Sequence, residues 1–361
     1  MTKKTQVGLI FGGNSSEYEV SIMSGHNIYN AIDQDKFDVH PIWITNDGYL
    51  ASEEDSFKVL KNPKYTIENP HEVANISNLI QLKNLPEIDV FFPIVHGNLG
   101  EDGCLQGLFR ILNKPFVGDD VLASAVTMDK EFTKILAQRV GVPVADWIAI
   151  KRFEYEDAAN AKRDYDKVSA KLGSDLFVKP SNQGSSVGVH HVTNKEEFAE
   201  ALADAFRYDD KVLIEETIHG TEVETAVLGN DQPIVSGVGQ IINAAGTFYS
   251  YENKYDDDST TTLQIPAKLP QEIVAKVRAN ALKVYQVTEC SGLARVDSTL
   301  RDSDNKIILT EVNALPGFTN ISMYPKLFEE AGISYSELIT RLIEKAQERF
   351  NHKKNLLHKI G

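Results

Sequence analysis

The sequence predicts an α/β protein, α+β overall, whose amino-terminal domain contains a parallel sheet. In the first third of the chain, short apolar runs alternate with stretches that have a helical pattern. Residues 6–11, 37–44 and 88–95 are the expected strands, and residues 22–32 and 105–112 are the expected helices. Because the strand-like runs are apolar along their whole length, we expect a sheet that helices cover on both faces.

The middle of the chain has a different pattern. A helix is expected over residues 131–140, before a Gly-Val-Pro segment, and another helical stretch over residues 154–172. Residues 177–179 and 187–192 are expected to be strands, and residues 180–186 join them as a loop. This segment is therefore a strand-loop-strand unit rather than the strand-loop-helix unit of the first third.

The last third is expected to be rich in strands from residue 212 to about residue 311 and helical from residue 324 onward. These changes of pattern predict three domains, each long enough for its own core. The expected divisions are residues 1–122, 123–213 and 214–361.

The charge balance excludes several classes of partner. The 361 residues include 37 basic and 52 acidic side chains, which give a net charge of −15. This charge repels nucleic acid and anionic membrane surfaces. Two cysteines are too few for a disulfide framework, and no apolar run approaches the ~20 residues of a membrane span. We therefore expect a soluble, cytoplasmic protein that handles small anionic molecules.

The phosphate-binding signal lies in the middle of the chain. The sequence has no P-loop motif, and no complete Gly-x-Gly-x-x-Gly follows the first expected strand. Residues 184–188 (Gly-Ser-Ser-Val-Gly) do follow Lys179, and small residues let backbone N–H groups approach a phosphate. Taken alone, this segment is either a phosphate-binding loop or an ordinary hairpin turn.

A candidate metal site lies on two strands expected at residues 291–300 and 306–313. Alternation along the strands places Arg295 and Asp297 on one face, and Ile307, Leu309, Glu311 and Asn313 on one face of the next strand. If the two faces coincide, three oxygen ligands converge, which suits Mg²⁺. A solvated polar face is the alternative, and the apolar residues expected on the same face argue against it. The proposed ligands are Asp297, Glu311 and Asn313.

Two further segments remain open on the residues alone. Residues 251–255 carry a lysine and a tyrosine before an acidic stretch, and residues 253–262 form either a lid over a site or an exposed loop. Glu215 and Glu222 lie at the end of one strand and near the start of another. They either bind a base and a ribose or are ordinary surface glutamates.

Taken in order, these motifs resemble those of one family. Lys130, Lys179 with residues 184–188, Glu215 with Glu222, and the Arg295–Asn313 motifs resemble the ATP-grasp fold. Residues 12–21, 96–103 and 311–322 resemble the signatures of the D-alanine–D-alanine ligases. The resemblance extends from about residue 7 to residue 325, which is nearly the whole chain.

The resemblance implies an ATP-grasp fold of three domains and an enzyme that joins two D-alanines for peptidoglycan precursor synthesis. ATP would phosphorylate the first D-alanine, and the amine of the second would attack the resulting acyl phosphate. ATP and two Mg²⁺ ions, with Mn²⁺ as a substitute, are the implied cofactors, and a homodimer is the implied assembly. The implied ATP-binding residues are Lys130, Lys179, Ser186, Glu215, Ile218, Glu222, Phe248 and Lys254.

The resemblance also assigns the amino-acid site. Glu17, Ser185 and Tyr255 correspond to a hydrogen-bonded triad next to the first amino group, and Arg295 with the Gly317 N–H corresponds to the oxyanion-stabilising pair. The implied catalytic residues are Glu17, Ser185, Tyr255, Arg295 and Gly317. The implied substrate-binding residues are Glu17, His96, Lys254, Arg295, Gly317 and Ser322.

Three alternatives stay open. The first is a ligase that makes a D-alanyl-D-lactate ester, the second is another ATP-grasp carboxylate–amine ligase, and the third is a non-catalytic nucleotide-binding protein. By resemblance, tyrosine at position 255 accompanies dipeptide formation and phenylalanine accompanies lactate use, so Tyr255 predicts an amide product. The complete set of charged residues argues against a silent nucleotide binder.

Overall fold

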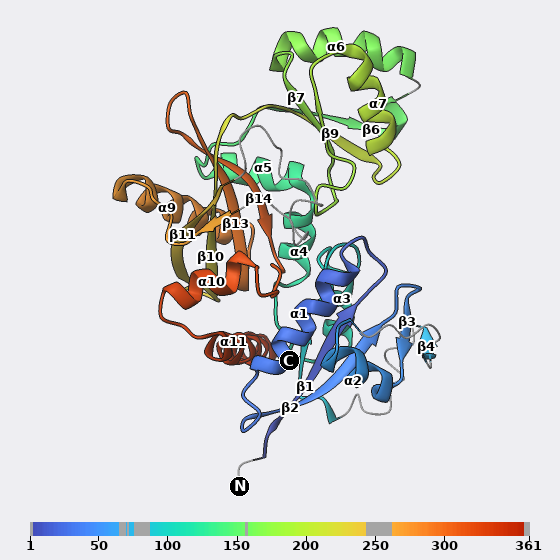
Figure 1. The fold of residues 1–361 in the computed structure, drawn as a ribbon, viewed down its shortest axis with the longest axis vertical. Helices are drawn as coiled ribbons and strands as arrows, with labels where there is room; N and C mark the ends of the chain where they lie inside the picture. The colour runs from blue at the N-terminus through green and yellow to red at the C-terminus, as the bar shows by residue number, and fades with distance from the viewer. Residues whose placement is uncertain are drawn as a thin grey trace.

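The computed structural model describes residues 3–64, 70, 72–75, 87–155, 158–242 and 262–356. Phe248, Lys254 and Tyr255, and all but the last residue of the predicted lid, lie outside the described residues. Within the described residues the chain forms three sheets, which follow one another along the long axis of the molecule (Figure 1). No described helix is long and apolar enough to cross a membrane.

The amino-terminal sheet has the strand order β4-β3-β2-β1-β5. β1 (Thr5–Gly12) pairs in parallel with β2 (Phe37–Ile44) and with β5 (Val90–Pro93), which confirms the predicted parallel core of the sheet. Two short strands that the sequence pattern did not predict add an antiparallel edge. They are β3 (Tyr49–Ala51) and β4 (Glu72–Asn75).

Three helices accompany this sheet, and the turn after β1 depends on glycine. The helices are α1 (Tyr18–Ala31), α2 (Glu53–Lys61) and α3 (Cys104–Ile111). Gly12, which ends β1, has φ +87°, and a Cβ there would lie 2.1 Å from the Ile44 carbonyl oxygen. Only glycine fits this turn, which leads the chain from the sheet edge into the segment that carries Glu17.

The sheet formed by the middle of the chain, called the middle sheet below, lies at one end of the molecule (Figure 1). It is antiparallel and has the strand order β6-β9-β7-β8. Its strands are β6 (Trp147–Lys151), β7 (Leu176–Pro180), β8 (His190–Val192) and β9 (Lys211–Glu216). Helices α6 (Ala158–Leu172) and α7 (Lys195–Ala205) share a core with it. A short 3-10 helix, η3 (Arg152–Glu154), follows β6, and the expected domain division after residue 213 falls inside β9.

Two helices connect the amino-terminal sheet to the middle sheet. They are α4 (Val121–Met128) and α5 (Lys130–Arg139). Asp129 caps α5, because its carboxylate accepts hydrogen bonds from the backbone N–H groups of Glu131 and Phe132. The cap fixes the first turn of α5 and therefore the position of Lys130.

The third sheet has the strand order β12-β11-β10-β13-β14, and its paired neighbours are antiparallel. Its strands are β10 (Gly220–Gly229), β11 (Ile234–Ile242), β12 (Thr262–Gln264), β13 (Gly292–Arg301) and β14 (Ile307–Asn313). The expected strand-rich region also contains α9 (Gln271–Val287), a helix of 17 residues that the prediction missed. Val277, Ala281 and Val284 lie on its buried face, with a helical spacing.

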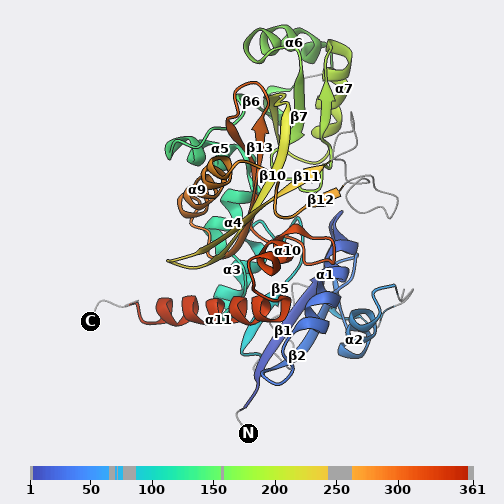
Figure 2. The ribbon, with the colours of Figure 1, turned by 60° about the vertical axis from the view of Figure 1, so that its left-hand side comes forward.

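The carboxyl-terminal helices return to the amino-terminal domain. They are α10 (Met323–Glu330) and α11 (Tyr335–Lys354), and α11 lies across the region between the first and third sheets (Figure 2). One core cluster combines Leu9 and Phe92 of the first sheet with Phe318, Tyr324 and Leu338 from the end of the chain. This shared core holds the first and third sheets together beside the site described next.

Candidate active site

A polar cavity lies where the segments that follow β1, β5 and β14 meet the loop between β7 and β8. It contains about 100 Å³, which is room for several water molecules and hence for a small amino acid. Its lining combines residues from all three parts of the chain. The predicted site residues that line it are Glu17, His96, Ser185, Arg295, Glu311, Asn313, Gly317 and Ser322.

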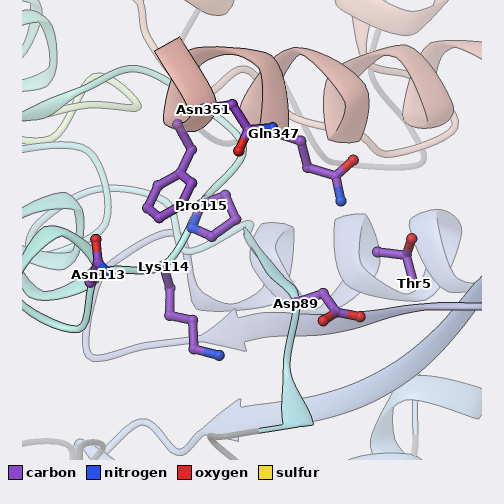
Figure 3. A pocket seen from close by; sticks show the side chains of 8 residues that line it. Thr5, Asp89, Asn113, Lys114, Pro115, Gln347 and Asn351 are labelled. Atoms are coloured by element: carbon purple, nitrogen blue, oxygen red, sulfur yellow. The ribbon is translucent and has the colours of Figure 1, made fainter. Parts of the chain in front are cut away.

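A second cavity lies elsewhere, at the amino-terminal ends of β1 and β5 next to α11. It is larger, about 490 Å³, and Figure 3 shows Thr5, Asp89, Lys114 and Gln347 on its walls. None of the predicted site residues that the structure describes lines it. Lys114 donates to the Ile88 carbonyl at 2.6 Å, so its ammonium group is already held by the protein. The smaller cavity is therefore the candidate site.

At one end of the candidate site, the amino-terminal domain contacts the loop between β7 and β8. The Ser185 hydroxyl donates a hydrogen bond to Glu17 Oε1. Gly184 makes this approach possible, because a Cβ there would lie 2.8 Å from Glu17 Oε2. Ser185 and Ser186 both have positive φ, 48° and 60°, so the loop turns sharply toward Glu17. The two domains thus place a carboxylate and a hydroxyl side by side.

His96 forms part of the same wall and is 3% exposed. Its Nδ1 lies 3.9 Å from Glu101 Oε1, and its Nε2 lies 3.5 Å from Ser24 Oγ. Burial lowers the pKa of His96, but the nearby Glu101 carboxylate outweighs burial and leaves the pKa above its ordinary value. Glu101 also lines the cavity, although the prediction did not include it. Its place in the 96–103 signature was the available signal.

The segment after β14 forms a second backbone wall around Gly317. Phe318 N donates to Ser24 Oγ at 3.0 Å, and Thr319 N donates to Ser322 Oγ at 2.9 Å. A Cβ at Gly317 would lie 2.8 Å from Ser322 Oγ, so a side chain at this position would displace the Ser322 hydroxyl. The Gly317 backbone and the Ser322 hydroxyl are consequently held close together at the cavity.

Arg295 is the central cation of the cavity. It makes a bidentate pair with Asp297, at 2.8 Å from Nε to Oδ1 and 2.7 Å from Nη2 to Oδ2. Its Nε also lies 2.9 Å from Glu224 Oε2, and Glu224 is only 5% exposed. Burial lowers the pKa of Arg295, but these carboxylates outweigh burial and raise the pKa well above its ordinary value. Glu224 is a cavity residue that the prediction missed.

The predicted metal ligands lie together on β13 and β14. Asp297 is directly opposite Glu311, and Asn313 Nδ2 donates to Asp297 Oδ2 at 2.9 Å. Two carboxylates with one amide are oxygen ligands that suit Mg²⁺, with waters and phosphates completing the coordination. No group of three or more His, Cys, Asp and Glu residues that could hold a metal occurs among the described residues, so the amide is needed for a third protein ligand.

The alternation predicted along β14 was wrong for Ile307 and Leu309, which do not share the face of Glu311 and Asn313. The pairing of β13 and β14 shifts between Asp297 and Ser298, which leaves Thr310 as an extra, exposed residue between Leu309 and Glu311. Leu309 therefore joins Val312 in a buried core instead of sharing the face of Glu311. The bulge allows an apolar strand to present a carboxylate at the cavity.

Charged side chains extend from the cavity to the middle sheet. Lys130 Nζ donates to the Gln183 carbonyl at 2.6 Å and lies 3.7 Å from Glu311 Oε2. Lys179 Nζ lies 2.6 Å from Glu215 Oε2. Lys130 thus connects α5 with the wall of predicted metal ligands, Asp297, Glu311 and Asn313 (the metal-ligand wall), while Lys179 and Glu215 pair across β7 and β9. Ile218 lies in the segment between β9 and β10, and Glu222 lies on β10, opposite Thr299 of β13.

Two family models match the chain. The one described as D-ala D-ala ligase N-terminus matches residues 6–119, and the one described as D-ala D-ala ligase C-terminus matches residues 136–344. The chain belongs to the D-alanine–D-alanine ligase family. It is therefore a ligase, and the expected ATP-grasp fold is confirmed.

Individual members of this ligase family are similar over nearly the full length. The D-alanine–D-alanine ligase of Lactobacillus acidophilus is 78% identical, over 99% of both chains. The solved VanG D-Ala:D-Ser ligase of Enterococcus faecalis has a TM-score of 0.79 and 34% identity, and covers 95% of this chain and 100% of its own. The D-alanine–D-alanine ligase of Bacillus anthracis, solved in complex with ATP, has a TM-score of 0.74 and 30% identity. The match covers 97% of this chain and 99% of that ligase.

Proposed function

We propose that this ligase joins two D-alanines to D-alanyl-D-alanine, with ATP as the energy source and a D-alanyl phosphate as the intermediate. The product would enter peptidoglycan precursor synthesis. The observation that carries the proposal is the small cavity where Glu17, His96, Arg295 and Ser322 meet. Their charges and donors match an ammonium group, a carboxylate and a developing oxyanion within one small space.

In the first half-reaction, the Glu17 carboxylate holds the ammonium group of the first D-alanine. The substrate carboxylate then lies toward Arg295 and the metal-ligand wall, where it attacks the γ-phosphorus of ATP and ADP leaves. Lys130, Lys179 and Lys254 neutralise the phosphate oxygens, with Ser186 as a further donor. Glu215, Ile218, Glu222 and Phe248 bind the adenosine part of ATP.

The metal-ligand wall supports the same step. Asp297, Glu311 and Asn313 would hold two Mg²⁺, or Mn²⁺ in their place. Bound metal supplies charge that draws electron density from the phosphate oxygens. The bidentate pair with Arg295 holds the Asp297 carboxylate in place when the phosphates enter.

In the second half-reaction, the neutral amine of a second D-alanine attacks the acyl carbon. A C–N bond forms, the tetrahedral intermediate carries an oxyanion, and the C–O bond to phosphate then breaks. Arg295 and the Gly317 N–H stabilise the oxyanion. Ser322 and Lys254 bind the carboxylate of the second D-alanine. Closure of the segment at 253–262 excludes water, which would otherwise hydrolyse the acyl phosphate.

Tyr255 supports an amide rather than an ester product. In the proposed triad, its hydroxyl would join Ser185 and Glu17 and connect the lid to the first-substrate site. Family membership and the full set of charged residues favour this reaction over the lactate-using ligase, over another carboxylate–amine ligase and over a silent nucleotide binder. D-Serine is a further second substrate to test, because the related Enterococcus faecalis enzyme is a D-Ala:D-Ser ligase.

The remaining assignments are proposals of the same kind. The substrates are D-alanine and ATP, and neither nucleic acid nor a membrane surface is a partner, given the net charge of −15. The protein works in the cytoplasm, where ATP is available, and is a homodimer. Three domains at residues 1–122, 123–213 and 214–361 fit the three sheets if the first division moves out of α4 and the second moves to the end of β9.

A substrate panel tests the proposal. Phosphate release would be measured with ATP and Mg²⁺ in the presence of D-alanine, L-alanine, D-serine and D-lactate, alone and in competition with D-alanine, over a pH series. We expect release that depends on D-alanine, with D-alanyl-D-alanine as the main product near neutral pH. Abundant ester from the unmodified protein would contradict the amide assignment, and release independent of any amino acid would contradict the ligase assignment.

A further inference from the structure

Lys134 is a buried cation that has no part in the reaction as proposed. It lies on α5, one turn after Lys130, and is 1% exposed. Its Nζ lies 3.0 Å from Glu215 Oε1, donates to the Ala145 carbonyl at 3.3 Å and sits 5.7 Å from the centre of the Trp147 ring. A fully buried lysine is rare unless it is paired with an opposite charge. The partner of Lys134 is Glu215, so the role of Lys134 depends on Glu215.

Glu215 lies between two lysines. Oε1 lies next to Lys134, while Oε2 lies 2.6 Å from Lys179. A carboxylate oxygen can accept two hydrogen bonds, so Oε1 keeps the capacity to accept one from a ligand beside its contact with Lys134. Burial raises the pKa of Glu215, but the charges of the two lysines outweigh burial and leave the pKa below its ordinary value. The carboxylate is thus ionised although it is only 5% exposed.

The proposed contacts of Lys179 with phosphate and of Glu215 with adenine conflict with the ion pair that these two side chains form with each other. A phosphate bound by Lys179 competes with Glu215 for the same ammonium charge and draws Lys179 away from the carboxylate. When it leaves, Glu215 becomes a buried carboxylate that needs another cation, because an unpaired buried charge is strongly unfavourable. Lys134 is already next to it, and no rearrangement of α5 is required.

We infer that Lys134 is a positioning residue for nucleotide recognition: it remains with Glu215 as the fixed counter-ion, which releases Lys179 to the phosphates and leaves the carboxylate to accept the adenine 6-amino group. This inference rests on the proposed roles of Glu215 and Lys179 in binding ATP. Lys130 and Lys134, one turn apart on α5, then serve the phosphate end and the base end of one nucleotide.

The test is Lys134→Met, which removes the charge and keeps an unbranched side chain. The dissociation constant for ATP, from calorimetry without D-alanine, and the KM for ATP should both rise about tenfold or more, while kcat changes less than about threefold. Preference for ATP over inosine triphosphate, which has no 6-amino group, should fall by a similar factor. Arg139→Met, which removes an exposed cation from the same helix, should leave all four values unchanged.

A double variant shows whether Lys134 acts through Glu215. In a Glu215→Gln background, Lys134→Met should add less than about twofold to the KM for ATP, since no buried carboxylate remains to be neutralised. Lys134→Arg, which keeps the charge, should stay within about threefold of the unmodified protein in its affinity for ATP.

Several outcomes would overturn the inference. One is a normal affinity and base preference in Lys134→Met. Another is independent, multiplying effects of the two substitutions. If Lys134→Met does not fold, the double variant is compared with Glu215→Gln instead. If neither Lys134→Met nor the double variant folds, Lys134 is needed for folding and the inference is wrong. Because ATP binding is measured without D-alanine, absence of ligation in the unmodified protein would count only against the proposed function.

Discussion

The carboxylate of Glu311 illustrates how a single side chain acquires its role from its surroundings. It faces Asp297 across the β13–β14 pair and lies 3.7 Å from Lys130. The neighbouring strand residues Leu309 and Val312 are buried in a core, so the backbone at Glu311 has little freedom to move. A metal ligand on such a strand is held in place before any ligand arrives.

Glu311→Gln removes this charge and keeps the shape of the side chain. Turnover should fall by about 100-fold or more, because the metal loses an ionised ligand, while the melting temperature stays within a few degrees. Phosphate release at saturating Mg²⁺ measures the first quantity and thermal unfolding the second. Glu344→Gln, an exposed position on α11, is the matched control and should have full activity. Normal turnover in Glu311→Gln would remove Glu311 from the metal site.

The convergence of the three proposed metal ligands could be predicted from the sequence, but the path of β14 could not. A simple alternation gives Leu309 and Glu311 the same face, and only the extra residue Thr310 separates them. The apolar and polar pattern of a strand does not show where a bulge occurs. Likewise, Glu224 reaches Arg295 only because β10 pairs with β13, a long-range pairing that the local sequence does not specify.

Among the elements, the loop between β7 and β8 has the strongest influence on the site. It contributes the Gln183 carbonyl to Lys130 and the Ser185 hydroxyl to Glu17. Ser181 also accepts a backbone hydrogen bond from Lys130 N at 3.1 Å. One loop is therefore connected both to α5 and to the start of α1, so it can transmit the binding of nucleotide to the amino-acid site.

Ser185→Ala tests this connection. Loss of one hydrogen bond to a carboxylate costs about 1–2 kcal/mol, so the KM for the first D-alanine should rise roughly five- to thirtyfold. The affinity for ATP without D-alanine should change much less. Ser169→Ala on α6 is the control, since its hydroxyl donates a long hydrogen bond of 3.4 Å to the Asp166 carbonyl of its own helix. An unchanged KM for D-alanine would show that Ser185 does not support Glu17.

At the level of elements, strongly patterned segments were predictable and α9 was not. The prediction for β2 was correct at both ends, and those for α3 and α5 were correct to within one residue. The helix α9 was missed although Val277, Ala281 and Val284 have a helical spacing, because charged and polar residues separate them and strands surround the segment. The strands predicted on both sides of α9 therefore concealed the helical spacing of its apolar residues.

At the level of the whole molecule, a buried polar junction joins the amino-terminal domain, β13 and α11. Asp119 Oδ1 accepts from Ser291 N, and Arg349 Nη2 donates to the Phe116 carbonyl at 2.8 Å. Arg349 Nη1 also donates to Ser291 Oγ at 2.7 Å and to the Gly118 carbonyl. Burial raises the pKa of Asp119 to about 8, although the Ser291 hydrogen bond and Arg349 oppose the shift.

This pKa makes stability depend on pH. An unfolded aspartate has a pKa of about 3.9, so between about pH 4 and pH 8 the native state holds a proton that the unfolded state has lost. The free energy of unfolding should therefore fall as pH rises through this window, by at most about 1.4 kcal/mol per pH unit. Asp119→Asn should flatten this decline, as measured by urea unfolding at several pH values.

Asp120→Asn is the matched control. Burial raises the pKa of Asp120, but its pairing with Lys353 outweighs burial and leaves the pKa lowered, so its contribution to stability is lost only as pH falls below about 4. The decline between pH 4 and pH 8 should persist in this variant. A decline that persists equally in Asp119→Asn would show that Asp119 does not stay protonated in the folded protein.

The proposed reaction at this site can be traced with an isotope. If the first D-alanine is phosphorylated on its carboxylate, one carboxylate oxygen must leave with phosphate when the second amine attacks. The decisive measurement uses D-alanine labelled with ¹⁸O in the carboxylate, together with ATP and Mg²⁺, and follows the label by mass spectrometry of the released phosphate. We predict one ¹⁸O in each released phosphate for each D-alanyl-D-alanine formed. Dipeptide formation with unlabelled phosphate, or phosphate release without dipeptide, would contradict the account.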